Sequence, residues 1–225
     1  MPISDALYKI LIKDGAYITF LKGLLVTVEI SFFGILFGTA LGALICRMRM
    51  SKAAFPRGIA KVYIVILRGS PVLLLLMLLY YGVFAKTTLS AITVAIITFA
   101  LNVSASVAEL LRTAIEATER GQVEAALTLG FTPGQAFRLI TLPQLVKVAK
   151  PVYQSTVVNL IQWTSVVGYV AITDLTRVIN NTAARTMQPF LTILIGLLIY
   201  LALAYIVHGI FALTDRRRTK GGEKK

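Results

Sequence analysis

The sequence is poor in the residues from which most catalytic and metal sites are built. Its 225 residues include one cysteine, one histidine and one tryptophan, and only 15% are charged. Cys46, as the sole cysteine, excludes an internal disulfide and any cluster of cysteine ligands. His208, the sole histidine, argues against multi-histidine metal sites and against a Ser-His-Asp triad with a spare base. We therefore expect no catalytic residues and no metal site in this chain.

Hydrophobic residues, in contrast, make up 57% of the chain, and the mean hydropathy is +0.79. Soluble domains are about 45–50% apolar and about 25% charged. A soluble domain of this length would expose the excess in contiguous patches, which promote aggregation. The composition therefore excludes a soluble globular enzyme and a disordered chain.

The apolar residues gather in five charge-poor stretches that are long enough to cross a membrane. A bilayer core about 30 Å thick requires about 20 apolar residues in helical conformation. The stretches are continuous rather than alternating, which favours helices over strands. The sequence thus predicts an all-α integral membrane protein with five transmembrane helices, at residues 24–46, 62–85, 89–108, 152–172 and 190–213.

The basic residues predict how these helices are oriented. Of the 23 lysines and arginines, 16 lie in three segments on one side of the predicted membrane, at 47–61, 112–150 and 216–225. By the positive-inside rule this side is cytoplasmic, which places the N-terminus outside and the C-terminus in the cytoplasm. The net charge of +13 is then explained by topology and contact with membrane lipids, and we predict no nucleic-acid partner.

Without repeats or linkers, the chain is predicted to be a single transmembrane domain, 1–225. Residues 1–22 lack the pattern of a signal peptide, and Ile3, Leu7, Ile10 and Leu11 share a helical face. We expect an amphipathic helix in the membrane interface there. Residues 109–150 form a cytoplasmic loop, and 215–225 form a basic tail that faces phospholipid.

Polar residues at membrane depth are costly, so each is a functional candidate. Glu29 and Arg68 lie near the ends of their stretches, where snorkelling to the headgroups explains them. The candidates for a substrate pathway are Asn102, Ser106, Gln162, Trp163, Thr164 and Ser165. The hydroxyls among these residues either bond back to helix carbonyls or line a polar face. The tryptophan either packs against its neighbours or forms a wall of a polar pocket.

Three glycines at a spacing of four, Gly34, Gly38 and Gly42, form a small-residue face on the first stretch. Such a face lets another helix approach closely. That helix belongs either to the same subunit or to a second copy.

The 109–150 loop contains signals for two short helices. A first helix at 122–129 is closed by Gly130 at the C′ position. Thr132-Pro133-Gly134-Gln135 supplies an N-cap, a first-turn proline and a capping-box glutamine for a second helix, which Leu142-Pro143 ends. Partly exposed apolar residues form a knob that either packs on the chain's own spans or docks a soluble subunit, namely Ala125, Ala126, Leu127 and Phe131.

This loop closely resembles the EAA loop of ABC importer permeases. The resemblance rests on Gly121-Gln-Val-Glu-Ala-Ala-Leu-Thr-Leu-Gly130 followed by Ile140-Thr-Leu-Pro143. Further segments resemble the polar amino acid uptake subgroup, of histidine, glutamine or arginine type: Gly23-Leu-Leu-Val-Thr27 with Ser31, Arg68-Gly-Ser-Pro71 with Tyr80-Tyr-Gly82, Ala108-Glu109 with Arg112 and Ile115, and Asp174-Leu-Thr-Arg177.

The resemblance implies a type I ABC importer permease fold and a role as the permease subunit of an amino acid importer in the bacterial cytoplasmic (inner) membrane. It implies three kinds of protein partner: a cytoplasmic ABC ATPase dimer, a second permease subunit, identical or homologous, and an extracytoplasmic amino-acid-binding protein. The ATPase would bind the loop through Glu124, Ala125, Ala126, Gly130 and Phe131. ATP-driven closure of the ATPase would move the permease pair by alternating access.

ATP and Mg are expected only in that partner, because the chain contains no Walker-type phosphate loop. We therefore expect a chain that is no enzyme and holds no cofactor.

One departure from the family pattern bears on the substrate. Where relatives usually carry Lys and then Asp or Glu in the fourth stretch, this chain has Gln162 and Trp163, and Ser106 replaces a frequent Tyr. We therefore expect a polar or neutral amino acid, such as cystine or glutamine, rather than arginine or lysine.

Two other functions are alternatives. The first is a secondary transporter that uses Glu29 or Arg68 for ion coupling, which the lack of inverted repeats disfavours. The second is a non-transporting anchor for a soluble partner, which would have no use for the intramembrane amides.

Overall fold

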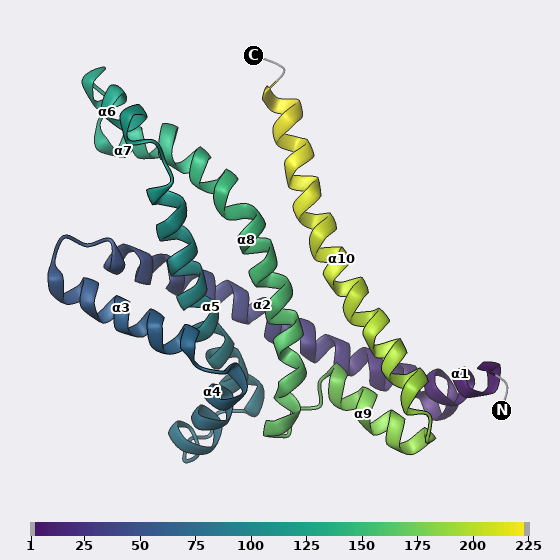
Figure 1. The fold of residues 1–225 in the computed structure, drawn as a ribbon. Coiled ribbons are helices and arrows are strands. Elements are labelled where there is room, and N and C mark those ends of the chain that lie inside the picture. The colour runs from purple at the N-terminus through teal and green to yellow at the C-terminus, as the bar shows by residue number, and fades with distance from the viewer. Residues whose placement is uncertain (1–2, 223–225) are drawn as a thin grey trace. The chain divides into compact units, whose positions relative to one another are not determined.

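The computed structural model describes the backbone of residues 3–222 and the side chains of residues 4–214, so the side chains of the predicted basic tail lie outside the described residues. Every element in this part of the chain is helical (Figure 1). The α-helices are α1 (Ile3–Leu11), α2 (Ala16–Arg49), α3 (Ala54–Gly69), α4 (Val72–Leu78), α5 (Ala91–Glu116), α6 (Arg120–Thr128), α7 (Pro133–Ala136), α8 (Leu142–Trp163), α9 (Leu175–Thr186) and α10 (Pro189–Gly222). Two 3₁₀ segments, η1 (Lys13–Gly15) and η4 (Thr164–Val170), and two π segments, η2 (Leu79–Val83) and η3 (Phe137–Thr141), connect them.

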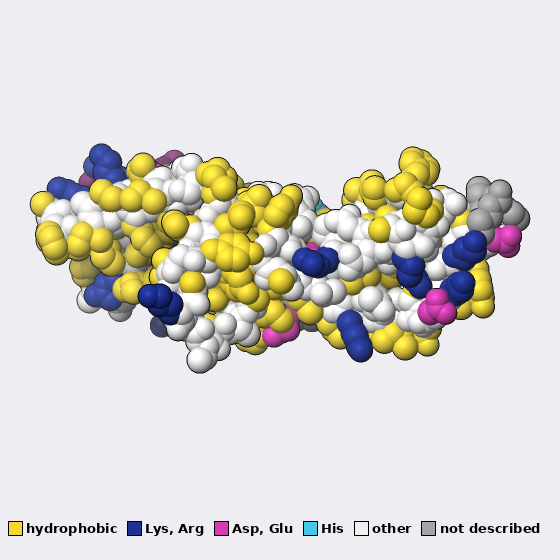
Figure 2. Space-filling view, turned by 90° about the horizontal axis from the view of Figure 1, so that it is seen from below, with side chains coloured by type: hydrophobic (Ala, Val, Ile, Leu, Met, Phe, Trp, Pro, Cys, Tyr) yellow, Lys and Arg dark blue, Asp and Glu magenta, His cyan; other side chains and the backbone are white. Residues whose placement is uncertain are grey.

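The helices supply three to five candidate membrane spans, and five were predicted. Three of them are long and apolar enough to cross a membrane alone: Lys13–Arg49, Ala91–Glu116 and Pro189–Thr214. Two bent pairs meet the same test together: Ala54–Gly69 with Val72–Val83, and Pro133–Val170 with Leu175–Thr186. Counting each pair as one span gives five. Exposed hydrophobic side chains cover much of the face seen in Figure 2, as lipid contact requires.

The chain folds into two compact units. Unit 1 comprises Met1–Gly34, Pro71–Phe99 and Val157–Lys225, and unit 2 comprises Ile35–Ser70 and Ala100–Thr156. Each unit is described by itself below.

In unit 2, α2 packs on α5 through the predicted small-residue face. A Cβ atom on Gly38 would lie 2.7 Å from Cγ1 of Val103, and one on Gly42 would lie 2.8 Å from Cβ of Val107. These glycines therefore allow a close approach of two helices within one chain. Of the two alternatives left open for this face, packing within the subunit is confirmed.

The second predicted stretch, 62–85, is not one continuous helix. Its first part belongs to α3, which begins already at Ala54 and ends at Gly69, and the chain is extended at Ser70 and Pro71. Proline disfavours helical conformation in the residue before it and has no N–H for the carbonyl of Leu67. This charge-poor stretch, with a proline near its centre, therefore forms two helices that are bent by 107° at the break.

In unit 1, the amphipathic N-terminal helix is shorter than predicted and packs on protein. α1 ends at Leu11, and residues 16–22 are the first turns of α2, because Asp14 and Gly15 adopt positive φ angles. Ile10 is fully buried in a cluster that includes residues of α9. The prediction that residues 1–22 form one helix is therefore wrong, and Ile10 on the apolar face of α1 packs on protein.

Candidate functional site

Unit 2 carries the 109–150 loop, in which α6 and α7 connect α5 to α8 (Figure 1). Gly130 has a φ of +89°, the left-handed conformation that glycine adopts without strain. Its N–H donates to the carbonyl of Leu127 at 3.0 Å, and the N–H of Phe131 donates to that of Ala126 at 3.1 Å. These two bonds form a Schellman motif, so the predicted C′ role of Gly130 is confirmed.

The capping box is also confirmed. The N–H of Thr132 donates to Oε1 of Gln135 at 2.8 Å, and the N–H of Gln135 donates to Oγ1 of Thr132 at 3.3 Å. Pro133 occupies the first turn of α7. Local sequence signals thus determine both the end of α6 and the start of α7.

The predicted helix end at Leu142-Pro143 is wrong. The helix passes from α7 through the π segment η3 into α8, and the N–H of Leu142 donates to the carbonyl of Phe137. In an α-helix, the Pro143 ring would clash with the carbonyl of Leu139. The π turn directly before Pro143 widens the helix locally, so the proline lies inside a continuous helix.

The exposed surface of the loop differs in part from the predicted apolar knob. Glu124, Ala125 and Gly130 are exposed, as is Phe131, but Ala126 is buried. α6 contacts α7 and η3, so Ala126 belongs to the inner face of the loop.

Leu129 is the most exposed apolar side chain of the loop, at 79%, and sequence reasoning missed it. An apolar residue directly before the C′ glycine of a polar short helix was the available signal. Together with Leu127 and Phe131, it forms an exposed apolar surface at the end of α6.

Hydrogen bonds hold α6 against the start of α8. Nε2 of Gln144 donates to Oε1 of Gln122 at 2.7 Å, and Nε2 of Gln122 donates to Oε2 of Glu119 at 2.9 Å. One side of α6 is therefore held by its own unit, which leaves Glu124 and Ala125 on a side that another molecule can reach.

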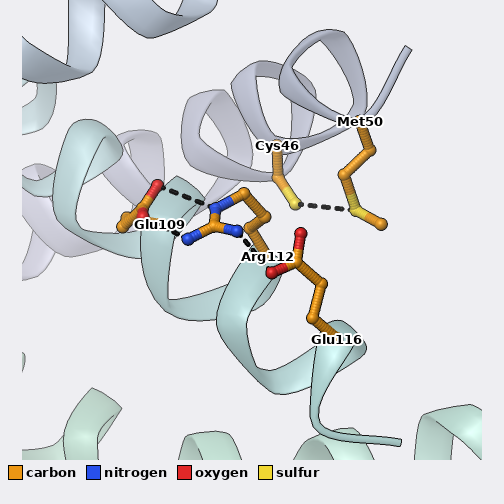
Figure 3. Close-up of polar contacts among 5 residues, drawn as sticks. All are labelled: Cys46, Met50, Glu109, Arg112 and Glu116. Atoms are coloured by element: carbon orange, nitrogen blue, oxygen red, sulfur yellow. Dashed lines mark hydrogen bonds and ion pairs between the residues drawn. The ribbon is translucent and has the colours of Figure 1, made fainter. Parts of the chain in front are cut away.

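An ion-pair cluster lies near the end of α5, just before α6 (Figure 3). Arg112 contacts Glu109 through two bonds, from Nη2 at 2.6 Å and Nε at 3.1 Å, and it also pairs with Glu116. Carboxylates near a helix C-terminus oppose the helix dipole, and the guanidinium between them offsets this. The cluster therefore stabilises the last turns of α5 that lead into α6.

Cys46 and Met50, at the end of α2, lie beside this cluster, with their sulfur atoms 3.9 Å apart (Figure 3).

Of the predicted substrate pathway, Asn102 and Ser106 belong to unit 2. Asn102 is buried, and its Nδ2 donates to the carbonyl of Leu67 at 3.1 Å. This is the carbonyl that Pro71 leaves without a helical partner. Ser106 bonds back to the carbonyl of Asn102 at 3.5 Å. Asn102 thus stabilises the break after α3, whether or not it also faces a pathway.

Replacing Asn102 by leucine should therefore destabilise the protein. The Leu67 carbonyl would lose its partner in a buried setting, at a cost of about 1–3 kcal/mol. Ser106→Ala, which removes only a long back-bond, is the matched control and should change stability by about 0.5 kcal/mol or less. Thermal unfolding of the detergent-solubilised protein measures both. Equal unfolding temperatures for the two variants would contradict this role.

The other pathway residues belong to unit 1. Gln162 is exposed, Trp163 and Ser165 are half-buried, and Thr164 is buried. Oγ1 of Thr164 donates to the carbonyl of Ile161 at 2.7 Å, which is the back-bonded alternative expected for such hydroxyls. Here α8 passes into the 3₁₀ segment η4.

Buried polar contacts tie α9 to its neighbours in unit 1. The Asp174 carboxylate accepts the N–H groups of Thr176 and Arg177 at 2.9 and 3.0 Å, as an N-cap of α9. Oγ1 of Thr27, on α2, accepts the N–H of Leu175 at 3.2 Å, and the hydroxyls of Thr176 and Tyr200 lie 2.8 Å apart. The segments around Thr27 and Asp174 that carry the family resemblance therefore meet in the fold.

A polar groove of about 300 Å³ lies between η4 and α9. The residues that line it are Ser165, Gly168, Tyr169, Thr176, Arg177, Asn180 and Asn181. Sequence reasoning placed only Ser165 in the substrate pathway, and it named Thr176 and Arg177 only as part of the segment that carries the family resemblance. The lining residues come from two segments on either side of a turn, so no periodicity marks them as one site. Among the residues that the structure describes, no group of His, Cys, Asp or Glu could hold a metal ion.

Comparisons with known proteins place the chain in a family of transport proteins. Residues 31–220 match the model of the family described as "Binding-protein-dependent transport system inner membrane component". The chain is 36% identical over 199 residues to the probable amino-acid ABC transporter permease protein YckA of Bacillus subtilis (strain 168), covering 88% of this chain and 87% of that protein. It is 30% identical to the L-cystine transport system permease protein TcyB of the same organism, covering 87% and 84%.

Solved structures show the same fold. A crystal structure of an amino acid ABC transporter with histidines matches with a TM-score of 0.80 and 30% identity, over 88% of this chain and 94% of that one. An inward-facing structure of the MetNI methionine ABC transporter matches with a TM-score of 0.73 over 92% and 99%, at 18% identity. The type I ABC importer permease fold is therefore confirmed.

Proposed function

Because the chain belongs to the family of binding-protein-dependent transport system inner membrane components, we propose that it is the amino-acid-translocating permease subunit of an ABC importer. The observation that carries this proposal is the 109–150 loop. Its short helix α6 is held on one side by Gln144 and presents Glu124 and Ala125 on the other.

The proposed partner at this loop is a cytoplasmic ABC ATPase dimer. The exposed surface formed by Leu127, Leu129 and Phe131 offers an apolar anchor, and Glu124 beside it offers a charged hydrogen bond. A few fully buried side chains commonly supply most of the binding energy of an interface. ATP and Mg reside in that partner, and this chain transmits its movement without being an enzyme.

Membership of a family of inner membrane components supports a location in the bacterial inner membrane, and the distribution of charge supports a C-terminus in the cytoplasm. With this orientation the α6 loop faces the ATPase, and α9 faces the side from which an extracytoplasmic amino-acid-binding protein delivers its ligand. A second permease subunit, identical or homologous, completes the pathway.

A polar or neutral amino acid is the proposed substrate. Gln162 is exposed and Trp163 half-buried in unit 1, and no acidic residue lies between Leu160 and Ile172 to hold a basic side chain. Named relatives of this chain include permeases for L-cystine and a putative one for glutamine.

The test is ATP hydrolysis and uptake by the complete complex in vesicles, with the binding protein and a panel of amino acids. Stimulation by cystine, glutamine or another uncharged amino acid is the expected result. Stimulation by no amino acid would contradict the function, and stimulation by arginine or lysine alone would contradict the substrate class.

A further inference from the structure

The polar groove between η4 and α9 has the chemistry of a binding site for a small anion. Its volume of about 300 Å³ is at the lower end of the range for small-molecule sites, about 300–1,000 Å³. Three of its lining residues, Arg177, Asn180 and Asn181, carry N–H donors, and Ser165, Tyr169 and Thr176 add hydroxyls. The groove therefore combines one guanidinium with amide and hydroxyl groups, all of which can donate hydrogen bonds to an anion.

Arg177 is held in position along the groove. Its Nη1 donates to the carbonyl of Gly168 at 2.6 Å, and this is the single hydrogen bond found for the guanidinium in the described part of the chain. Nε and Nη2 stay available for a ligand. A guanidinium presents its donors in a plane that matches the two oxygens of a carboxylate.

No acidic side chain lines the groove to neutralise Arg177. Asp174, three residues away, is fully buried, and its carboxylate accepts the backbone N–H groups of Thr176 and Arg177. It therefore stabilises the start of α9 and does not occupy the guanidinium.

We propose that this groove binds the carboxylate of a free amino acid through Arg177, with the side-chain amides of Asn180 and Asn181 able to accept bonds from its ammonium group. The site is distinct from the predicted pathway residues 162–164, and the assignment of an amino acid as its ligand rests on the proposed function. On the outer side of the membrane, the groove would hold the solute between its release from the binding protein and its passage.

Its accessibility can be measured directly with an Asn181→Cys variant in the complete complex in vesicles. Cys46, the only native cysteine of this chain, is buried, so its peptide should stay unmodified and provides an internal control in peptide mapping. Each rate is divided by the rate of the same reagent with a small free thiol. On this relative scale a small anionic methanethiosulfonate should modify position 181 faster than its cationic counterpart, by about tenfold, because a positive cleft concentrates anions. A mixture of the twenty common L-amino acids should slow this reaction. Equal rates for the two reagents, or no protection, would overturn the proposal.

Arg177→Gln then tests the proposed ligand group, and Arg185→Gln is its matched control. Both remove one positive charge from α9, but Arg185 lies outside the groove, where it pairs with Asp14 at 3.3 Å. Arg177→Gln should raise the amino acid concentration for half-maximal protection by about tenfold, equivalent to about 1.4 kcal/mol. Arg185→Gln should leave it unchanged, and Arg177→Lys should restore part of the loss.

Two further outcomes separate the alternatives. If both glutamine variants weaken binding of the amino-acid-binding protein equally and protection is unaffected, this face docks a protein, and the proposal is wrong. If Arg177→Gln fails to fold, Asn180→Leu, at an exposed lining position, should still weaken protection. Amino acid uptake by the wild-type complex is measured alongside and tests the proposed function separately. Protection of position 181 without uptake would contradict the proposed function alone, and uptake without protection would contradict the groove alone.

Discussion

Replacing Gly42 by alanine is expected to force α2 away from α5 and to destabilise the protein strongly. The new Cβ would lie 2.8 Å from Cβ of Val107 and 2.9 Å from the carbonyl oxygen of Ser104. The second neighbour is backbone, which cannot rotate away, so the helices must separate. Overpacking of this kind costs about 1–3 kcal/mol, and leucine at the same position should prevent folding.

Gly58→Ala is the matched control, because no atom lies within 4 Å of the Cβ that it would add. The apparent unfolding temperature of the detergent-solubilised protein measures the difference, at about 2–4 °C per kcal/mol for a chain of this size. If Gly42→Ala unfolds at the temperature of Gly58→Ala, the close approach of α2 to α5 is absent from the protein.

Features that depend on a few neighbouring residues were predictable from the sequence. Gly130 after an amphipathic segment predicts a C′ position because a left-handed turn favours glycine. Thr132 and Gln135 predict a capping box because their spacing brings side chain and backbone together. The five apolar stretches likewise follow from the thickness of a bilayer, so the fold class was predictable as well.

Features that depend on contacts between distant residues were not predictable in this way. The packing of Ile10 into a cluster with α9 joins segments more than 160 residues apart, and an amphipathic pattern fits a membrane surface equally well. Pro143 predicts a helix end, and only the π turn before it, which no sequence rule required, keeps the helix continuous.

The candidate sites show the same division. The α6 loop was found from a contiguous motif, whereas the η4–α9 groove depends on how one turn folds Arg177 back onto Gly168. Asn102 was singled out because an amide at membrane depth is costly. Its bond to the Leu67 carbonyl became visible only when the break at Pro71 was known. A polar residue inside a membrane span can therefore satisfy the backbone as well as serve transport.

Replacing Gly130 by valine is expected to detach the proposed ATPase partner while the helices stay inserted. A β-branched residue at a φ of +89° is strained, and a left-handed conformation costs an ordinary L-residue about 1–2 kcal/mol. Relief of that strain breaks the backbone hydrogen bonds from Gly130 and Phe131 to the last turn of α6. The exposed apolar surface of Leu127, Leu129 and Phe131 then turns away from its partner. One or two kcal/mol is a factor of about 5–30 in an equilibrium, so ATPase recovered with the tagged permease should fall at least fivefold.

Gly134→Ala is the matched control. It removes a glycine from the same loop at a position that does not require a positive φ angle. Gly134 lies in α7 with helical geometry, and nothing lies within 4 Å of the Cβ that alanine would add. Recovery of the ATPase should therefore equal that of the wild type. Gly130→Asn should give an intermediate result, since asparagine tolerates the left-handed conformation better than valine does. If Gly130→Val recovers the ATPase as well as Gly134→Ala does, the turn at Gly130 does not position the loop for its partner, and the ATPase binds elsewhere.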